Sequence, residues 1–254
     1  MRIYVCIKQV PDSEAIIKIV GDTEYNREVV YVVNPYDEYG VEEAVRLKEN
    51  NGDGEVIAVC VGGEGAVSAL RTVMAMGVDR SVLVKTGEQF VGSDLTAQAL
   101  AWVIEQEGPA DIIFAGKQSM DSEGMQTPYR LGAQIGLPVV SNVVNFSLEK
   151  TTALVQREMG GGLRESLTVK TPCIIGANKG LNEPRYPKMH AILKAKKKEI
   201  KVLDIAELTI QDNSGVQLKG LHPAEDRSEA RILEGTAEEA VSSLVDILAE
   251  QRII

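Results

Sequence analysis

The residue types best suited to binding an anion lie in Ile112–Gln134, between an apolar run and a helical pattern. The apolar run Ile112–Ala115 ends at Gly116, and a polar loop follows. A helical pattern begins at about Ser122, so the stretch predicts a buried strand, a turn and a helix N-terminus. Helix N-terminal N–H groups favour anions, and open α/β sheets bind ligands at such junctions. An ordinary strand–helix connection explains this stretch alone equally well.

The sequence lacks the motifs of common catalytic centres. It contains no G-x-S-x-G elbow, no P-loop and no G-x-G-x-x-G. His190 and His222 stand far from any second ligand residue, so no metal site is predicted. The three glycines 160–162 are not followed by a helix and indicate a flexible turn. We therefore predict no catalytic residue, and the pattern favours a carrier or binding subunit over an enzyme.

The overall charge argues against nucleic acid as a partner. The 254 residues carry 27 basic and 37 acidic side chains, a formal net charge of −10. Phosphate attraction would have to come from a local patch, and the only dense basic run is Lys194–Lys198. We interpret that run as a solvated face. Aromatic residues make up only 4% of the chain, and an aliphatic core suits parallel strands buried on both faces.

The three cysteines are expected to be reduced and buried. Cys6, Cys60 and Cys173 all lie in apolar runs, and an odd count without C-x-x-C is typical of a reducing compartment. No apolar run is long enough to span a membrane. The first residues already have the pattern of a core strand and leave no room for a signal peptide. The sequence thus predicts a cytoplasmic protein.

Strands and helices alternate through the first half of the chain. Predicted strands cover Arg2–Lys8, Glu55–Val61, Ser81–Lys85 and Ile112–Ala115, and predicted helices cover Asp37 to Gly52, Ala66–Met76 and Leu95–Glu107, the last with Ser93 or Asp94 as its N-cap. Short apolar pieces in 15–33 indicate a small hairpin or excursion. The alternation predicts an α/β fold with a Rossmann-like, nucleotide-binding parallel sheet.

The pattern changes after Pro138. Short β-like runs at 143–148, 153–157 and 166–169 predict antiparallel additions to the sheet, and 172–176 predicts one more buried strand. We expect an α/β nucleotide-binding domain at 1–190 and a C-terminal extension at 191–254. The extension contains a coreless arm at 211–231 and an amphipathic helix that a Thr236 capping box begins. The arm could lie on its own domain or embrace a partner.

Four segments together resemble the beta subunit of electron transfer flavoproteins. They are VCIKQVPD at 5–12, NPYDEYGVEEAVRLKE at 34–49, GKQSMDSEGMQT at 116–127 and ANKGLNEPRYPKMHAILKAKKK at 177–198. They occur in the family's order and cover nearly the whole chain. The last segment is the most specific, because LNEPRY followed by a basic run is rarely met by chance.

The resemblance implies a heterodimer whose alpha subunit holds most of the redox FAD site and is wrapped by the C-terminal arm. Electrons would pass from acyl-CoA-type dehydrogenases, as in fatty acid oxidation, toward a membrane quinone oxidoreductase. The beta subunit would bury a structural AMP. By motif, the nucleotide contacts would be Cys6, Asn34, Pro35, Tyr36, Asp37, Val61, Gly116, Lys117, Gln118, Ser119, Met120, Asp121, Ser122, Glu123, Gly124, Met125, Gln126 and Thr127. Tyr36 occupies the position of an aromatic residue beside the FAD ring.

The resemblance also implies a docking segment for partner dehydrogenases. It comprises Ala177, Asn178, Lys179, Gly180, Leu181, Asn182, Glu183, Pro184, Arg185 and Tyr186. Leu181, expected to be exposed, would anchor it in a partner pocket. Without the resemblance, a leucine folded back onto its own domain would be the simpler interpretation.

The nucleotide itself remains open between two types. Electron-bifurcating relatives hold a second FAD in this site and oxidise NADH, and their loop tends to read DGDTAQVGP where residues 121–129 here read DSEGMQTPY. Gln126-Thr127 and LNEPRY resemble the AMP type. VCIKQVPD, NPYDEY and 92–94 (GSD) are similar to the bifurcating group. We favour AMP with one redox FAD. A stand-alone nucleotide-binding protein of the same fold is the third class.

Overall fold

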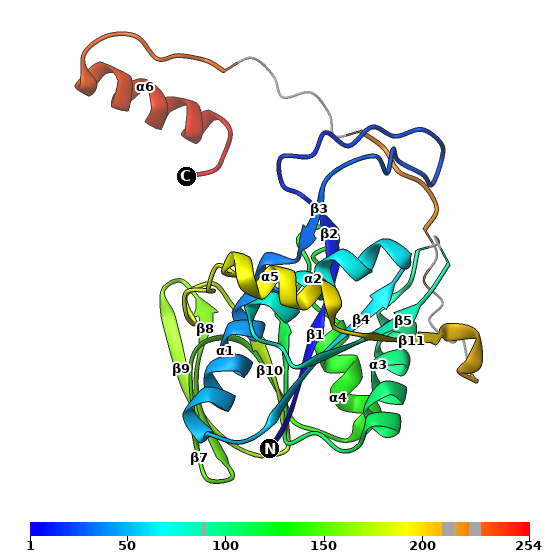
Figure 1. The fold of residues 1–254 in the computed structure, drawn as a ribbon. Helices are drawn as coiled ribbons and strands as arrows, with labels where there is room; N and C mark the ends of the chain where they lie inside the picture. The colour runs from blue at the N-terminus through cyan, green and yellow to red at the C-terminus, as the bar shows by residue number, and fades with distance from the viewer. Residues whose placement is uncertain (88–89, 210–215, 217, 224–229) are drawn as a thin grey trace.

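The computed structural model describes residues 1–254 except 88–89, 210–215, 217 and 224–229. Its centre is a sheet in the order β11-β5-β4-β1-β6-β10-β7-β8-β9, and a small pair β2-β3 lies beside it (Figure 1). The strands are β1 Arg2–Ile7, β2 Gln9–Pro11, β3 Tyr31–Val33, β4 Glu55–Gly62, β5 Arg80–Lys85, β6 Ile112–Gly116, β7 Val139–Glu149, β8 Thr152–Gly160, β9 Leu163–Lys170, β10 Cys173–Ala177 and β11 Ile200–Asp204.

Helices cover both faces of the sheet. They are α1 Pro35–Asn51, α2 Val67–Met76, α3 Ser93–Glu107, α4 Thr127–Ile135, α5 Met189–Lys197 and α6 Ala237–Glu250, with short 3-10 turns η1 Glu64–Ala66 and η2 Ile205–Glu207. Helices α1, α2 and α5 pack on one face, and α3 and α4 pack on the other (Figure 1). Strand β1 serves both cores, because Ile3 and Val5 point to one face while Tyr4 and Cys6 point to the other.

The parallel α/β prediction is confirmed. Strands β5, β4, β1, β6 and β10 are all paired in parallel, and β11 extends the same series beyond β5. The predicted antiparallel addition is confirmed too, since β7, β8 and β9 pair antiparallel. Each of these three strands is longer than its apolar run, because the flanking polar residues continue the ladder on the solvent side. Within the predicted excursion 15–33, Ile19 and Tyr25 form one bridge, and β3 pairs with β2, which precedes the excursion.

Two predicted helix starts were wrong. Helix α3 begins at Ser93, and its N-cap is Gly92, with no side-chain cap, rather than Ser93 or Asp94. Helix α4 begins at Thr127 rather than at about Ser122. Glu123 and Met125 have positive φ angles of 49° and 53°, which a helix does not allow. Pro128 in the first turn then sets a φ angle suited to a helix start.

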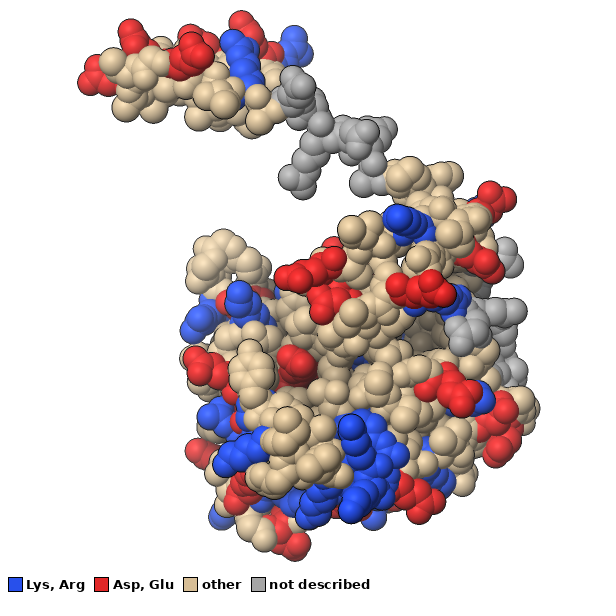
Figure 2. Space-filling view, turned by 45° about the horizontal axis from the view of Figure 1, so that its top comes forward, with Lys and Arg blue, Asp and Glu red and all other residues tan. Residues whose placement is uncertain are grey.

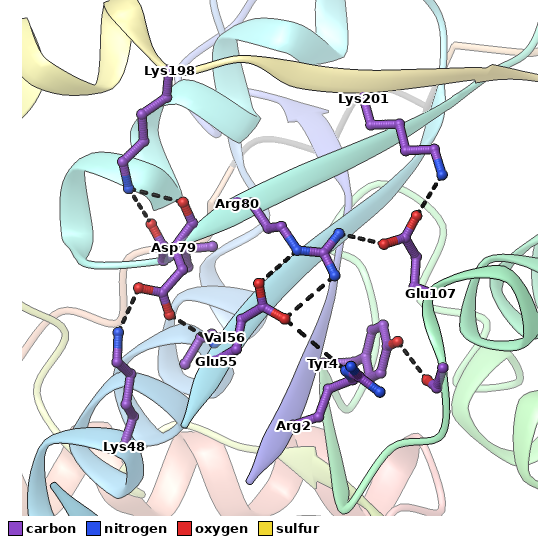
Figure 3. A network of polar contacts seen from close by, with 12 residues as sticks. Arg2, Tyr4, Lys48, Glu55, Val56, Asp79, Arg80, Glu107, Lys198 and Lys201 are labelled. Atoms are coloured by element: carbon purple, nitrogen blue, oxygen red, sulfur yellow. Dashed lines mark hydrogen bonds and ion pairs between the residues drawn. The ribbon is translucent and has the colours of Figure 1, made fainter. Parts of the chain in front are cut away.

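A polar network joins the C-terminal part of the domain to the amino ends of the sheet strands (Figure 3). Arg80 of β5 is paired with Glu55 of β4 (2.7 Å) and with Glu107 of α3. Glu107 also accepts from Lys201 of β11 (2.6 Å). Lys198 donates to the carbonyl oxygens of Val78 and Asp79 (2.8 and 3.0 Å). These contacts hold β11 and the end of α5 on the main domain.

The predicted boundary at residue 190 falls inside α5, and β11 is part of the main sheet. The assignment of 191–254 to a partner-binding extension stays a prediction. Of the predicted arm 211–231, residues 211–215, 217 and 224–229 lie outside the described residues. Within the described part, the Leu221 N–H donates to the Asp22 carbonyl oxygen of the N-terminal excursion (2.7 Å).

Helix α6 stands away from the sheet, and its predicted capping box is confirmed. The Thr236 side chain accepts from the Glu239 N–H, and the Glu239 carboxylate accepts from the Thr236 N–H. Val241, Leu244 and Val245 are 61%, 46% and 47% exposed. Figure 2 shows charged side chains along one side of α6 and none along the side that faces the rest of the chain. Among the described residues, no helix has the length and apolar character needed to cross a membrane.

Candidate nucleotide site

The predicted anion-binding junction lies where the strand order reverses. From β1 the chain moves through α1 to β4 and β5 on one side, and α3 then returns it to β6 on the other side of β1. Because all these strands are parallel, the carboxyl ends of β1, β4 and β6 meet at one edge. Ligands of open α/β sheets bind outside that edge, at such a reversal. The loop after β6 and the start of α1 both lie there.

Asp37 joins two of these strand ends from the first turn of α1. Its carboxylate accepts from the Lys8 N–H just beyond β1 (2.7 Å) and from the Gly116 N–H at the end of β6 (2.9 Å). The side chain is 5% exposed. Burial raises the pKa of Asp37 from its ordinary 3.8 to about 7, although the hydrogen bonds to its side chain act in the opposite direction. The buried Asp37 side chain thus joins the ends of β1 and β6 at the base of the site.

Gly116 allows α1 to approach the end of β6. A Cβ atom at this position would lie 2.4 Å from Asp37 Oδ1 and 2.8 Å from the Cβ of Tyr36. Neither neighbour has room to move, because Asp37 is buried and Tyr36 belongs to the helix start. The residue is needed here for close packing, and its lack of a side chain leaves the N–H free to reach the carboxylate.

Asn34 holds the loop that follows β6. It is 1% exposed, and its side-chain amide donates to the Gln118 carbonyl oxygen (2.9 Å) while its Oδ1 accepts from the Met120 N–H (3.1 Å). Its own backbone N–H donates to the Lys8 carbonyl oxygen (2.9 Å). One asparagine therefore ties residues 118–120 to the end of β1, and the structure brings the predicted residues of the 34–37 and 116–120 segments together.

Lys8 is a site residue that the sequence prediction missed. Its ammonium group lies 2.8 and 2.7 Å from the two carboxylate oxygens of Asp121 and 3.4 Å from Ser119 Oγ. The Ser119 hydroxyl is also hydrogen-bonded to that of Ser122 (2.8 Å). The position of Lys8 in the sequence could have identified it, since a lysine directly after a buried parallel strand must lie at the ligand-binding edge of the sheet. Lys8 supplies positive charge beside a loop whose side chains are mostly acidic or neutral.

Tyr36 and Lys117 form a second contact across the site. The Lys117 ammonium lies 5.1 Å from the centroid of the Tyr36 ring, which is cation–π distance. The Lys117 N–H donates to the Ala177 carbonyl oxygen at the end of β10 (2.9 Å). The Tyr36 ring is half-buried, and Pro35 beside it is exposed. This contact places an aromatic ring on the rim of the site.

The second half of the loop leads into α4 and is less enclosed. The Glu123 carboxylate accepts from the Gln118 side chain (3.3 Å), and Gly124 is exposed. The Gln126 Oε1 accepts from Ser93 Oγ (3.0 Å) and Arg130 Nε (3.1 Å), so this side chain connects α3 with α4. Among the described residues, the backbone N–H groups of residues 124–127 have no partner. They are the available anion donors, together with the Thr127 hydroxyl.

Cys6 and Val61 occupy neighbouring strands at the same edge, β1 and β4. The Cys6 side chain is 9% exposed, and burial raises the pKa of its thiol to about 12. The thiol is therefore protonated and uncharged, and Cys6 lines the site without acting as a nucleophile. All three cysteines are buried and unpaired, as predicted. Within the described residues, no group of three histidine, cysteine or acidic side chains is placed to hold a metal ion.

The predicted docking segment folds onto the domain more closely than expected. Leu181 is not exposed: it is half-buried and packs against the core on the α1 side of the sheet. The Asn178 side chain donates to Glu158 of β8 (2.9 Å), and the Leu181 N–H donates to the Asn178 carbonyl oxygen (3.2 Å). Tyr186 is 96% exposed. A single sequence could not distinguish these cases, because the segment is polar throughout except for Leu181.

Comparison with known proteins agrees with this geometry. The family model "Electron transfer flavoprotein domain" matches residues 23–208. The chain is 36% identical to the electron transfer flavoprotein subunit beta of Thermoanaerobacterium thermosaccharolyticum and 30% identical to that of Bacillus subtilis, with all of each chain covered. It is 33% identical to the human subunit beta, with 97% of this chain and 98% of the human protein covered. The chain therefore belongs to the electron transfer flavoprotein family, as one of its beta subunits.

Proposed function

We propose that this chain pairs with an alpha subunit as an electron carrier. The heterodimer accepts electrons from acyl-CoA-type dehydrogenases and passes them toward a membrane quinone oxidoreductase, through an FAD that the alpha subunit mostly holds. The beta subunit buries an AMP. The observation that carries the proposal is the junction at the strand reversal, where Asn34 joins the loop after β6 to the end of β1 and Asp37 joins the ends of β1 and β6. Family membership supports the flavin and the alpha subunit.

The residues at this site fit a nucleotide that ends in one phosphate. The N–H groups of 124–127, which have no partner in the part of the chain that the structure describes, the Thr127 hydroxyl and the Lys8 ammonium provide donors for an anion. The strand ends near Cys6 and Val61 provide backbone groups and apolar walls for a flat base. Asp37 sits beneath the loop, and its carboxylate is already occupied by two N–H groups. It therefore supports the loop rather than the phosphate.

The flavin, when bound, supplies the one- and two-electron chemistry. This chain's contribution is to orient it and shield it. Tyr36 lies on the rim of the site with Lys117 above its ring, where a partner's flavin could stack against an aromatic surface. The proposed carrier role needs no acid or base from the beta subunit, in agreement with a buried neutral thiol at Cys6.

Releasing and counting the bound small molecules tests the proposal. The purified heterodimer should yield about one FAD and one AMP per dimer after denaturation, measured by absorbance and chromatography against standards. Two FAD without AMP, together with rapid flavin reduction by NADH, would instead identify the bifurcating type. A chain that is folded and monomeric, and that binds nucleotide without any partner, would point to the stand-alone class.

Truncating Leu181 tests the docking segment. Leu181→Ala should raise the KM for an acyl-CoA dehydrogenase about tenfold, because anchor side chains in a partner pocket contribute on the order of 1–2 kcal/mol. FAD content should not change. Steady-state transfer from the substrate-reduced dehydrogenase to the heterodimer measures the effect.

Because Leu181 also packs on its own core, a matched control is needed. Leu167 of β9 is likewise half-buried against the same core but lies outside the docking segment. Leu167→Ala should lower the melting temperature to a similar degree and leave the KM alone. Equal KM values for the two variants would show that Leu181 is only a core residue.

A further inference from the structure

The docking segment is joined to α1 by one arginine that contacts two carboxylates. Arg185 Nε and Nη2 donate to the two oxygens of Glu42 (2.8 and 3.1 Å). Its Nη1 and Nη2 donate to the two oxygens of Glu49 (2.7 and 2.9 Å). The Arg185 backbone N–H also donates to Glu42 (3.2 Å). Both the main chain and the side chain of this residue are therefore fixed on the helix.

The Glu42 carboxylate is buried and therefore requires the cation that Arg185 provides. The Glu42 side chain is 4% exposed, and its only other ion-pair partner among the described residues is Arg46, one turn away (3.2 Å). A buried carboxylate without adequate cations is strongly unfavourable, so Glu42 selects the conformation in which Arg185 reaches it. A planar guanidinium can serve two carboxylates at once, which a lysine ammonium cannot do with the same geometry.

A neighbouring asparagine reinforces the arrangement. The Asn182 side-chain amide donates to the Tyr39 carbonyl oxygen (3.0 Å) and to Glu43 (2.8 Å), both on α1. The Asn178 side chain also donates to Glu158 of β8 (2.9 Å), so Asn178, Asn182 and Arg185 attach the segment at three points along its length. Tyr186, which follows Arg185 directly, is left almost fully exposed. The segment is thus preformed up to the point where it meets solvent.

We infer that Arg185 is a positioning residue that holds the docking segment in its binding conformation before a partner arrives. The inference rests on the docking role proposed above for residues 177–186. A segment already ordered in the free protein avoids the entropy cost of ordering on association. The same helix begins at the nucleotide site with Asp37, so one rigid element carries both surfaces.

Two measurements on the purified heterodimer test this role. Arg185→Gln should speed amide hydrogen exchange in 181–186 at least tenfold. It should also raise the KM for an acyl-CoA dehydrogenase about tenfold, with unchanged kcat and FAD content. Arg157→Gln is the matched control: Arg157 is paired with Glu165 at 2.7 Å and is similarly exposed, but it lies on the β8-β9 hairpin. It should change neither quantity.

Two milder substitutions distinguish loss of the ion pairs from misfolding of the chain. Glu49→Gln removes one of the two carboxylates that pair with Arg185, and Glu49 is exposed, so the substitution leaves the core intact. It should speed exchange and raise the KM less than Arg185→Gln does. Arg185→Lys should restore part of the slow exchange and, with it, part of the KM, because a lysine ammonium can still pair with one of the two carboxylates. Unchanged exchange in Arg185→Gln overturns the inference, and so does faster exchange with an unchanged KM. If exchange speeds up in Arg185→Gln while the unmodified heterodimer accepts no electrons from acyl-CoA dehydrogenases, Arg185 still orders the segment and the proposed function fails.

Discussion

Gly116→Val should cost about 2–4 kcal/mol of unfolding free energy and remove the nucleotide from the purified protein. The new side chain would have to occupy the space of Asp37 Oδ1 and the Tyr36 Cβ. Moving Asp37 would break its bonds to the Gly116 and Lys8 N–H groups and leave buried groups unpaired. The two segments that line the site would then separate.

Denaturant titration and nucleotide content together measure the effect. Gly124→Ala is the matched control, because it lies in the same loop and a Cβ there meets no atom within 4 Å. It should alter stability by less than about 0.5 kcal/mol, in line with ordinary surface substitutions. If Gly116→Val retains the wild-type nucleotide content, the close contact of α1 with β6 does not form the site.

Asp37 should make stability depend on pH in an unusual direction for a carboxylate. Its pKa is about 7 in the folded chain and near 3.8 when unfolded, so the native state holds one more proton between these values. The free energy of unfolding should therefore fall as pH rises through this window, by up to about 1.4 kcal/mol per pH unit. The contribution is fully present below about pH 4 and lost above about pH 7.

Asp37→Asn removes this dependence, because an amide does not titrate. The difference in unfolding free energy between the wild-type chain and Asp37→Asn should favour the wild type more at pH 5 than at pH 8. Asp111→Asn is the control, since Asp111 also accepts a backbone N–H but from an exposed position. A constant difference between wild type and Asp37→Asn from pH 5 to 8 would mean that Asp37 does not take up a proton in this range.

Local sequence signals were enough to predict most strands and helices of the sheet domain. Helix α1 shows the reason: a proline at its start, acidic residues in the first turn and Gly52 in the left-handed region at its end are all local features. The start of α4 was misplaced because residues 122–126 have helical composition but a turn backbone. Positive φ angles at Glu123 and Met125 form that turn, and amino-acid composition alone does not indicate them.

Residues brought together across the fold were harder to predict. Asn34, Gly116 and Thr127 were found through family motifs, whereas Lys8 was missed because its partner Asp121 is distant in sequence. Arg185 was included in the docking segment, but its partners Glu42 and Glu49 lie 143 and 136 residues earlier in the sequence and were not predicted. The reversal of strand order beside β1 is also nonlocal, since it depends on which side of the sheet α3 crosses.

The place of β11 bears on how the protein folds as it leaves the ribosome. Residues Ser81–Lys85 are available early in synthesis, but their neighbours Ile200–Asp204 emerge only after the whole β7-β8-β9 addition. Until then β5 is an unprotected edge strand rich in valine and leucine, which is a template for pairing with other chains. Polypeptides that stop short of residue 204 should consequently aggregate through β5. The last part of the sheet to be made is the part that closes this edge.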